Sequence, residues 1–233
     1  MKLIINIIII FLISITLNAR EIGETEITTE DGIEVFQNEK FYLLKQNVKI
    51  ISDNFTLSAD EVKVNFDKSL YDITELDANG NVDFESNAFE TSGSGNYLNF
   101  KVKVEKIKVE GEGSQLVTSE VKMFSDGFIE VSNLNGDFLL KGTNSKLVNE
   151  NIIIKAETIN GNFSEKGNEK EITYLEVIDK NISYIKNNDT EMYAKKINLD
   201  NNTATIELID NVTIIRNEER ISGDYGTLDT RNN

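Results

Sequence analysis

Hydrophobic and polar residues alternate with period two along almost the whole chain. Val62, Val64 and Phe66, for example, share one parity, and the residues between them are polar. This alternation is typical of β-strands with one buried face. No window of helical length carries a sustained apolar stripe. The sequence therefore predicts an all-β fold. Further strands are expected around Val48/Ile50, Phe55/Leu57, Leu98/Phe100/Val102/Val104, Ile152/Ile154, Leu175/Val177, Ile197/Leu199, Ile206/Leu208 and Val212/Ile214.

Changes of parity mark expected bends and bulges. Val102 and Val104 lie on one parity and Ile107 and Val109 on the other, so a bulge or tight turn is expected at Glu105-Lys106. Short turn signals recur between the apolar runs. They predict strands of about five to seven residues with hairpin-length links, as in a sandwich, jelly roll or open roll. The expected turns are 67–69, 79–81, 93–96, 111–113, 166–168, 187–189 and 200–202.

One short signature, an Asn followed by an apolar strand residue, recurs four times. A small residue follows eleven or twelve positions after the apolar one. Such recurrence predicts stacked units that bury their apolar faces only against neighbours. The signatures are Asn47-Val48, Asn81-Val82, Asn181-Ile182 and Asn211-Val212, and the small residues are Ala59, Gly93, Ala194 and Gly223.

The first residues have the composition of an export signal. Lys2 precedes an apolar run from 3 to 15, and Thr16-Leu17-Asn18-Ala19 follows as the expected cleavage site. We therefore expect residues 1–19 to be a cleaved signal peptide, followed by one domain over residues 20–233. The alternative is a retained membrane anchor, because Leu17 suits the cleavage site poorly. The apolar run is, however, shorter than the roughly 20 apolar residues that span a bilayer, and this favours a cleaved signal peptide over an anchor.

Charge excludes one class of partner. The chain carries −16, and loss of residues 1–19 removes Lys2 and leaves −17. Nucleic-acid binding needs clustered Lys and Arg, so nucleic acid is not an expected partner. There is no cysteine, and hence neither a disulfide framework nor a lipoprotein anchor.

Candidate catalytic groups are scarce. Without His or Cys, the chain has no Ser-His-Asp or Cys-His pair and no ordinary zinc site. Adjacent carboxylates are expected by chance among 40 acidic residues, and we interpret them as solvated. We expect neither an enzyme nor a cofactor or metal site. The weighed pairs are Asp60/Glu61, Glu169/Glu171 and Glu218/Glu219, and Asp200-Asn201-Asn202 is interpreted as a turn and not a calcium loop.

Two stretches resemble a known family. Leu57-Ser58-Ala59-Asp60-Glu61-Val62 and residues 221–230, Ile-Ser-Gly-Asp-Tyr-Gly-Thr-Leu-Asp-Thr, resemble the LptA/OstA family of periplasmic lipopolysaccharide transport proteins. The resemblance covers residues 40–100 and 170–230, and residues 101–170 match mainly in rhythm as a longer middle insertion. LptC and the amino-terminal domain of LptD share the same repeat.

The resemblance implies an OstA-like β jelly roll, an open V-shaped roll of stacked antiparallel strands. Its edges stack end to end with LptC-like and LptD-like components, or head to tail with further copies. It also implies a periplasmic, non-enzymatic bridge that shields the acyl chains of lipopolysaccharide in a hydrophobic groove, while an inner-membrane ATPase supplies the driving force. Exposing one twelve-carbon chain to water would cost on the order of 10 kcal/mol.

The inward parity supplies the expected groove lining, although a closed, dry core is the alternative from the residues alone. The expected lining is Val48, Ile50, Val62, Val64, Val82, Phe84, Ile197, Leu199, Val212 and Ile214. Unpaired edge strands attract partners. The expected partner edges are marked by Val35, Leu43, Ile221, Tyr225 and Leu228.

Two other functions fit the same pattern. An LptC-like component would retain residues 3–17 as an anchor, and a surface β-solenoid would use the periodicity only to stack turns. Because the chain is acidic, we expect a phosphorylated head group to stay outside the groove, in solvent or bridged by divalent ions.

Overall fold

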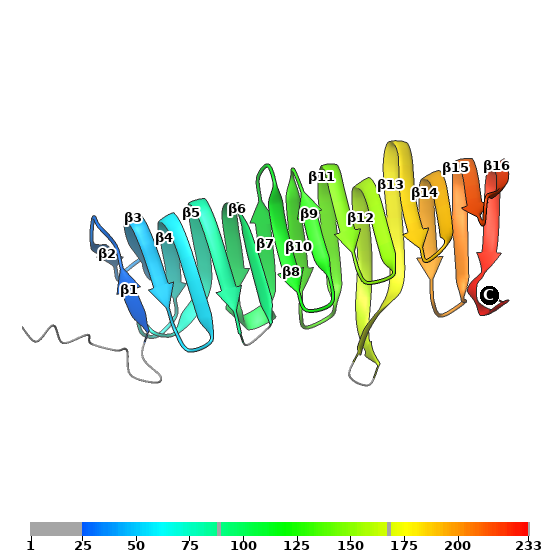
Figure 1. Cartoon of the computed structure of the whole chain (residues 1–233). Coiled ribbons are helices and arrows are strands. Elements are labelled where there is room, and N and C mark those ends of the chain that lie inside the picture. Colours follow the sequence, from blue (N-terminus) through cyan, green and yellow to red (C-terminus); the bar gives the residue numbers. More distant parts are fainter. Residues whose placement is uncertain (1–24, 88–89, 167–168, 233) are drawn as a thin grey trace, which may run out of the picture.

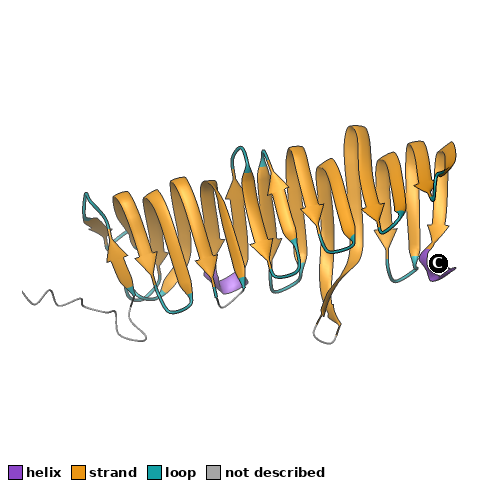
Figure 2. Cartoon of the chain, viewed as in Figure 1, coloured by secondary structure: helices purple, strands orange, loops and turns teal. Residues whose placement is uncertain are grey.

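The computed structural model describes residues 25–87, 90–166 and 169–232. All strands join one elongated antiparallel sheet of 16 strands, with β1 and β16 at opposite ends (Figures 1 and 2). Two 3-10 turns, Val102–Val104 and Thr230–Asn232, complete the described secondary structure. The strands are β1 Glu26–Thr28, β2 Ile33–Phe36, β3 Phe41–Ile51, β4 Phe55–Phe66, β5 Ile73–Ser86, β6 Thr91–Lys101, β7 Lys106–Glu110, β8 Ser114–Thr118, β9 Lys122–Ser125, β10 Phe128–Ser132, β11 Asp137–Val148, β12 Ile152–Lys166, β13 Glu169–Asn187, β14 Thr190–Asp200, β15 Thr205–Arg216 and β16 Glu219–Asp229.

Each long strand is bent near its middle. The pairing of β3 with β4 shifts between Lys45 and Val48, and that of β15 with β16 between Ile209 and Val212. Equivalent shifts interrupt the other pairings of long strands. These bulges form one line along the sheet, which we call the crease. In Figure 1 the strands bend over along the upper side of the sheet.

The crease divides the sheet into two walls that face each other. The first wall consists of β2, β7, β10 and residues 41–45, 61–66, 73–79, 97–101, 137–141, 158–166, 169–178, 196–200, 205–209 and 225–229. The second wall consists of β1, β8, β9 and residues 48–51, 55–58, 82–86, 91–95, 145–148, 152–155, 183–187, 190–193, 212–216 and 219–223.

The middle of the chain continues both walls. On the first wall β6 pairs with β7, β7 with β10 and β10 with β11. On the second wall β6 pairs with β8, β8 with β9 and β9 with β11. The pairs β7/β8 and β9/β10 therefore act as two further bent strands, whose crease is an open turn. Residues 101–170 lengthen the sheet and do not interrupt it.

The recurring Asn lies at the crease. Asn47, Asn81 and Asn211 have φ angles of 50°, 46° and 56°. Among non-glycine residues, Asn adopts this left-handed conformation most readily, because its short side chain bonds locally. The Asn81 amide donates to both carboxylate oxygens of Asp60 at 3.2 and 3.0 Å. Asn181 forms a different corner, in which its N–H donates to Asp179 Oδ1 at 2.7 Å.

Small residues lie opposite the apolar signature residues across the crease. Val48 pairs with Ala59, and Val212 with Gly223. In the second signature Val82 pairs with Gly95, so the crease residue is Gly95 and not the expected Gly93. Gly93 lies opposite Phe84, whose ring would be 2.6 Å from an added Cβ. In the third, Ala194 faces Ser183, next to the expected Ile182.

Several expected boundaries are wrong for the same reason. Residues 79–81 and 93–96 lie inside β5 and β6, because Gly and Asn form a crease bulge there instead of a hairpin turn. The long strands are also about twice the expected length, since each crosses the crease. Val102 and Val104 belong to a 3-10 turn, not a strand, and the expected turn at Glu105 is confirmed by its φ of 45°.

The core lies between the two walls. Both inner faces carry the parity that the alternation predicts, and Val62, Val64 and Ile197 are fully buried there. The expectation of an all-β, OstA-like roll of antiparallel strands stacked in a V-shaped section is confirmed. The expected signal peptide lies outside the described residues. No helix in the described ranges is long and apolar enough to cross a membrane.

Candidate functional site

The ten residues predicted to line a groove all lie on the inner faces of the two walls. They belong to one continuous cluster of apolar side chains that runs along the sheet. Leu199 and Ile214 are half-buried at its margin, and the others are buried. In this structure the walls pack directly against each other at these positions. The inner faces are therefore continuous and apolar, and their use by acyl chains stays a prediction.

Two larger cavities open between the walls on the side away from the crease. The carboxy-terminal cavity has a volume of about 320 Å³ and lies among β12, β13, β14 and β15. Its floor is apolar, and Asn and Thr side chains stand at its rim. Of the ten predicted lining residues, Leu199 lines it. The apolar floor is Ile152, Ile154, Ile172, Leu175, Ile185, Met192, Leu199 and Ile206, and the rim includes Asn149, Asn187, Asn201 and Thr230.

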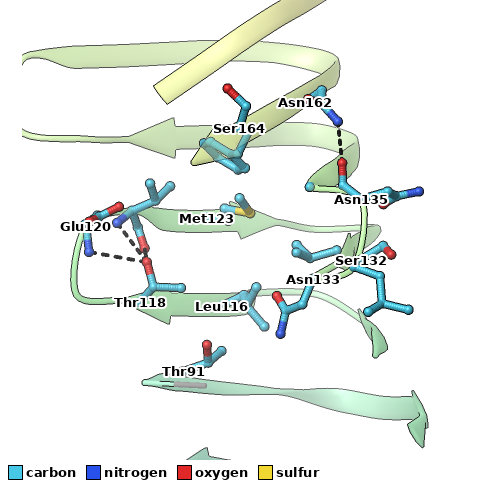
Figure 3. Close-up of a pocket in the computed structure, with 15 residues that line it drawn as sticks. Thr91, Leu116, Thr118, Glu120, Met123, Ser132, Asn133, Asn135, Asn162 and Ser164 are labelled. Carbon is cyan, nitrogen blue, oxygen red and sulfur yellow. Dashed lines mark hydrogen bonds between the residues drawn. The ribbon is translucent and has the colours of Figure 1, made fainter. Parts of the chain in front are cut away.

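The second cavity lies in the middle of the chain and has a volume of about 420 Å³. The second wall contributes Thr91, Leu116 and Met123, and the first wall contributes the turn 132–136 and Phe163. Figure 3 shows Thr91, Leu116, Met123 and Asn133 around this cavity, and the strands and turns that carry them are distant in the sequence. A narrower cavity of about 40 Å³ shares Thr91 and Leu116 with it. No local sequence pattern connects residues 91 and 163, so this site was not predicted from the sequence.

The two ends of the sheet are unpaired edges. At the carboxy-terminal end β16 pairs only with β15 in the described chain, and its Ile221 and Tyr225 are 68% and 61% exposed. Leu228 is half-buried and packs against the core. At the other end β1 and β2 are the last strands, and Val35 on β2 is 45% exposed. Leu43 lies on β3, one strand in from this edge.

Acidic groups lie mainly on the outer faces, where they pair with neighbours. Tyr97 donates to Asp77 at 2.6 Å, and burial together with this hydrogen bond raises the pKa of Tyr97. Tyr193 donates to Glu191 at 2.8 Å, which raises its pKa to about 12. Across the described ranges, no group of three acidic side chains converges as a metal site.

The carboxylate pairs weighed as catalytic are dispersed. Asp60 accepts from Asn81 at the crease, far along the strand from either rim. Glu218 and Glu219 lie in the exposed turn before β16 and at its start. Glu171 lies at the rim of the carboxy-terminal cavity. The three pairs therefore lie in separate parts of the sheet.

Comparison with known proteins finds a family match in the carboxy-terminal part of the chain. The family described as LptA/(LptD N-terminal domain) LPS transport protein matches residues 129–233. Among solved structures, the chain is similar to LptH, the LptA homologous periplasmic component of the lipopolysaccharide transport device of Pseudomonas aeruginosa. The identity is 11%, the TM-score 0.40, and the alignment covers 47% of this chain and 76% of that one. No curated protein matches. Residues 129–233 of this chain are thus similar to the LptA/LptD N-terminal domain family of lipopolysaccharide transport proteins.

Proposed function

We propose that the protein is a periplasmic bridge that binds lipopolysaccharide and shields its acyl chains between the two walls. The observation that carries this proposal is the continuity of the inner faces. The apolar cluster extends from Tyr42 on β3 to Val212 on β15, and cavities open into it between the walls. A path of this kind replaces contact between acyl chains and water along its length.

The energetic argument favours binding over diffusion. Burying one methylene contributes about 0.8 kcal/mol, so a lipid with several acyl chains cannot cross water unshielded. Because the walls pack against each other, insertion requires them to separate. The exchange replaces side-chain contacts by acyl-chain contacts of the same apolar kind, so its net cost is small. The crease is the hinge line, since its bulges and small residues connect two otherwise regular walls.

The edges supply the partner sites in this proposal. The exposed strands β16 and β1/β2 pair with LptC-like and LptD-like components, or with further copies head to tail. Strand addition would continue both walls and therefore the interior. The driving force comes from a partner, because transport along a shielded path needs no catalytic residue in this chain. The phosphorylated head group stays outside the groove, because it is repelled by an acidic chain whose charge after loss of residues 1–19 is −17.

The direct experiment is mass spectrometry of lipid extracted from protein purified without detergent from cells that make lipopolysaccharide. We expect lipid A-bearing molecules at a fixed ratio to protein. Protein without any copurified acyl lipid would contradict the proposal and favour a surface β-solenoid. Sequencing of the amino terminus separates the two transport roles: a start at Arg20 supports the periplasmic bridge, and retention of residues 3–17 supports an LptC-like anchored component.

A further inference from the structure

The middle cavity has features of a binding site of its own. It lies where the turn after β8 on the second wall faces the turn after β10 on the first wall (Figure 3). Its volume of about 420 Å³ falls in the range of small-ligand sites, about 300–1,000 Å³. With roughly 30 Å³ for each methylene, close to the volume of one water, it holds one alkyl chain of about a dozen carbons. It is too small for a whole multi-acyl lipid.

The floor of this cavity is apolar. Leu116 and Met123 of the second wall are 2% and 3% exposed. Phe163 of the first wall stacks at a tilt on Phe138, with ring centroids 4.4 Å apart. These side chains form an apolar lining on both sides of the middle cavity. An alkyl chain is the ligand that such a floor favours.

The rim is polar but almost uncharged. It presents amides and hydroxyls, and its only charged lining residue is Glu120. In a chain with 40 acidic and 24 basic residues, a rim with one charge is a distinct environment. Neutral amides and hydroxyls hydrogen-bond to the hydroxyl and amide groups of a sugar and give no cation for a phosphate. The rim residues are Thr91, Thr118, Ser132, Asn133, Asn135, Asn162 and Ser164.

Hydrogen bonds hold both turns of the rim in place. On the second wall the N–H of Val121 donates to Thr118 Oγ1 at 3.0 Å. On the first wall Asn162 Nδ2 donates to the carbonyl of Asn135 at 2.7 Å (Figure 3). Asn133 is exposed between these supports, and within the described residues no hydrogen bond engages its side-chain amide. The rim therefore offers a positioned amide beside the apolar floor.

We propose that the middle cavity is a side site that seats one acyl chain of an amphiphile whose head carries uncharged hydroxyl and amide groups. The chain lies against Leu116, Met123 and Phe163, and Asn133 hydrogen-bonds to the head. A lipid bound there enters the interior from the open side of the sheet, midway along its length. Entry is then not restricted to the two ends of the sheet. This inference rests on the proposed function only for the entry of acyl chains between the walls, and the site itself is tested separately.

The absence of tryptophan from the sequence makes a site-resolved experiment direct. Three variants each place one tryptophan: Phe163→Trp at the middle cavity, Leu199→Trp at the carboxy-terminal cavity and Lys141→Trp on an exposed outer position of β11. The probe is dodecyl maltoside brominated in its alkyl chain, used below its micelle-forming concentration. Bromine quenches tryptophan fluorescence on contact. Met123→Trp reports the same cavity from the other wall if Phe163→Trp unfolds.

We expect saturable quenching at Phe163→Trp and no quenching at Lys141→Trp. Quenching at Leu199→Trp alone would overturn the side site and leave acyl binding between the walls intact. Quenching at neither cavity would overturn both proposals. Quenching at Phe163→Trp alone would support the side site and contradict acyl binding at the carboxy-terminal cavity. Equal quenching at all three positions would show non-specific binding and overturn the inference.

The rim is tested by Asn133→Leu in the Phe163→Trp background. Loss of one hydrogen bond weakens maltoside binding about fivefold. Asn38→Leu in the same background removes an exposed amide from the turn after β2 and is the matched control, with unchanged binding. Brominated dodecyl sulfate, which has a charged head, should bind more weakly than the maltoside in the parent variant and lose no affinity with Asn133→Leu. Equal losses for both probes, or no loss for the maltoside, would overturn the role of Asn133.

Discussion

Two four-strand regions of the sheet, β3–β6 and β13–β16, follow the same plan but end differently. Ser94-Gly95-Asn96-Tyr97 on β6 corresponds to Ser222-Gly223-Asp224-Tyr225 on β16. In both, the glycine lies at the crease opposite a valine, Val82 or Val212. The tyrosine of each donates to a carboxylate of the preceding strand, Asp77 at 2.6 Å or Glu207 at 2.9 Å.

The difference is what covers the last strand. On β6 the bent pair β7/β8 lies alongside, and a Cβ at Gly95 would be 2.7 Å from Val109 Cγ1 and 2.9 Å from the carbonyl of Glu110. A Cβ at Gly223 would meet only the carbonyl of Tyr225, at 3.6 Å. Similar local sequences thus lie on an internal strand, β6, in one region and on an open edge strand, β16, in the other. We infer that β16 has the sequence of a strand suited to a neighbour like β7/β8.

The largest expected effect separates the cores of the two regions. Phe84 on β5 is 1% exposed, and its counterpart Ile214 on β15 is half-buried. Phe84→Ala should lower the free energy of unfolding by about 3–5 kcal/mol, because it leaves a cavity between the walls. Ile214→Ala should cost about 1–2 kcal/mol, since less apolar surface is lost. Urea unfolding measures both, and equal losses would contradict the comparison.

A smaller effect is expected at the matched crease glycines. Gly95→Ala should destabilise the protein by about 1–3 kcal/mol through overpacking against β7. Gly223→Ala should change the stability of the isolated chain by less than about 0.5 kcal/mol. If β16 is covered by a partner strand, Gly223→Ala should instead weaken assembly, measured by sedimentation of the protein with its partner. A large loss of stability of the isolated chain with Gly223→Ala would contradict the assignment of β16 as an open edge.

The smallest effect concerns the matched tyrosines. Tyr97→Phe should cost about 1 kcal/mol and Tyr225→Phe less, because the latter hydroxyl is in solvent. Burial and the bond to Asp77 raise the pKa of Tyr97, so its contribution is complete below the ordinary pKa of about 10 and decreases as the pH rises above it. Unfolding measured between about pH 9 and 12 should show a shallower loss for Tyr97→Phe than for the parent. Identical pH profiles would contradict a raised pKa.

The alternation of the sequence predicted the inner faces well, because period two leaves little choice once one face is buried. Val64 and Val212 are buried as that pattern requires. The recurring Asn signature of the crease was recognised in the sequence, but a bend within each strand was not predicted there. A hairpin turn and a crease bulge both use Gly and Asn in left-handed conformations, so Gly80 and Asn81 carry the same local signal for either.

The candidate site was less predictable than the fold. The middle cavity depends on which strand of one wall faces which strand of the other. Thr91 on β6 and Phe163 on β12 meet there because the five strands between them keep register across the crease. The distance between the walls at this cavity is set by the packing of the whole apolar cluster, and no short segment of the sequence encodes it. The edge residues Ile221 and Tyr225 were predictable, since they lie on the last strand of the repeat.

The proposed function requires the inner faces of the walls to be open to acyl chains in the working protein. Photocrosslinking amino acids test it at four positions in cells: Val64 and Leu199 on the inner face, and Lys49 and Asn198 on the outer face. Asn198 is a suitable outer control, because its amide donates to Glu207 at 3.1 Å. We expect lipopolysaccharide adducts at Val64 and Leu199 and none at Lys49 and Asn198. Equal capture at all four positions, or none at the inner two, would contradict it.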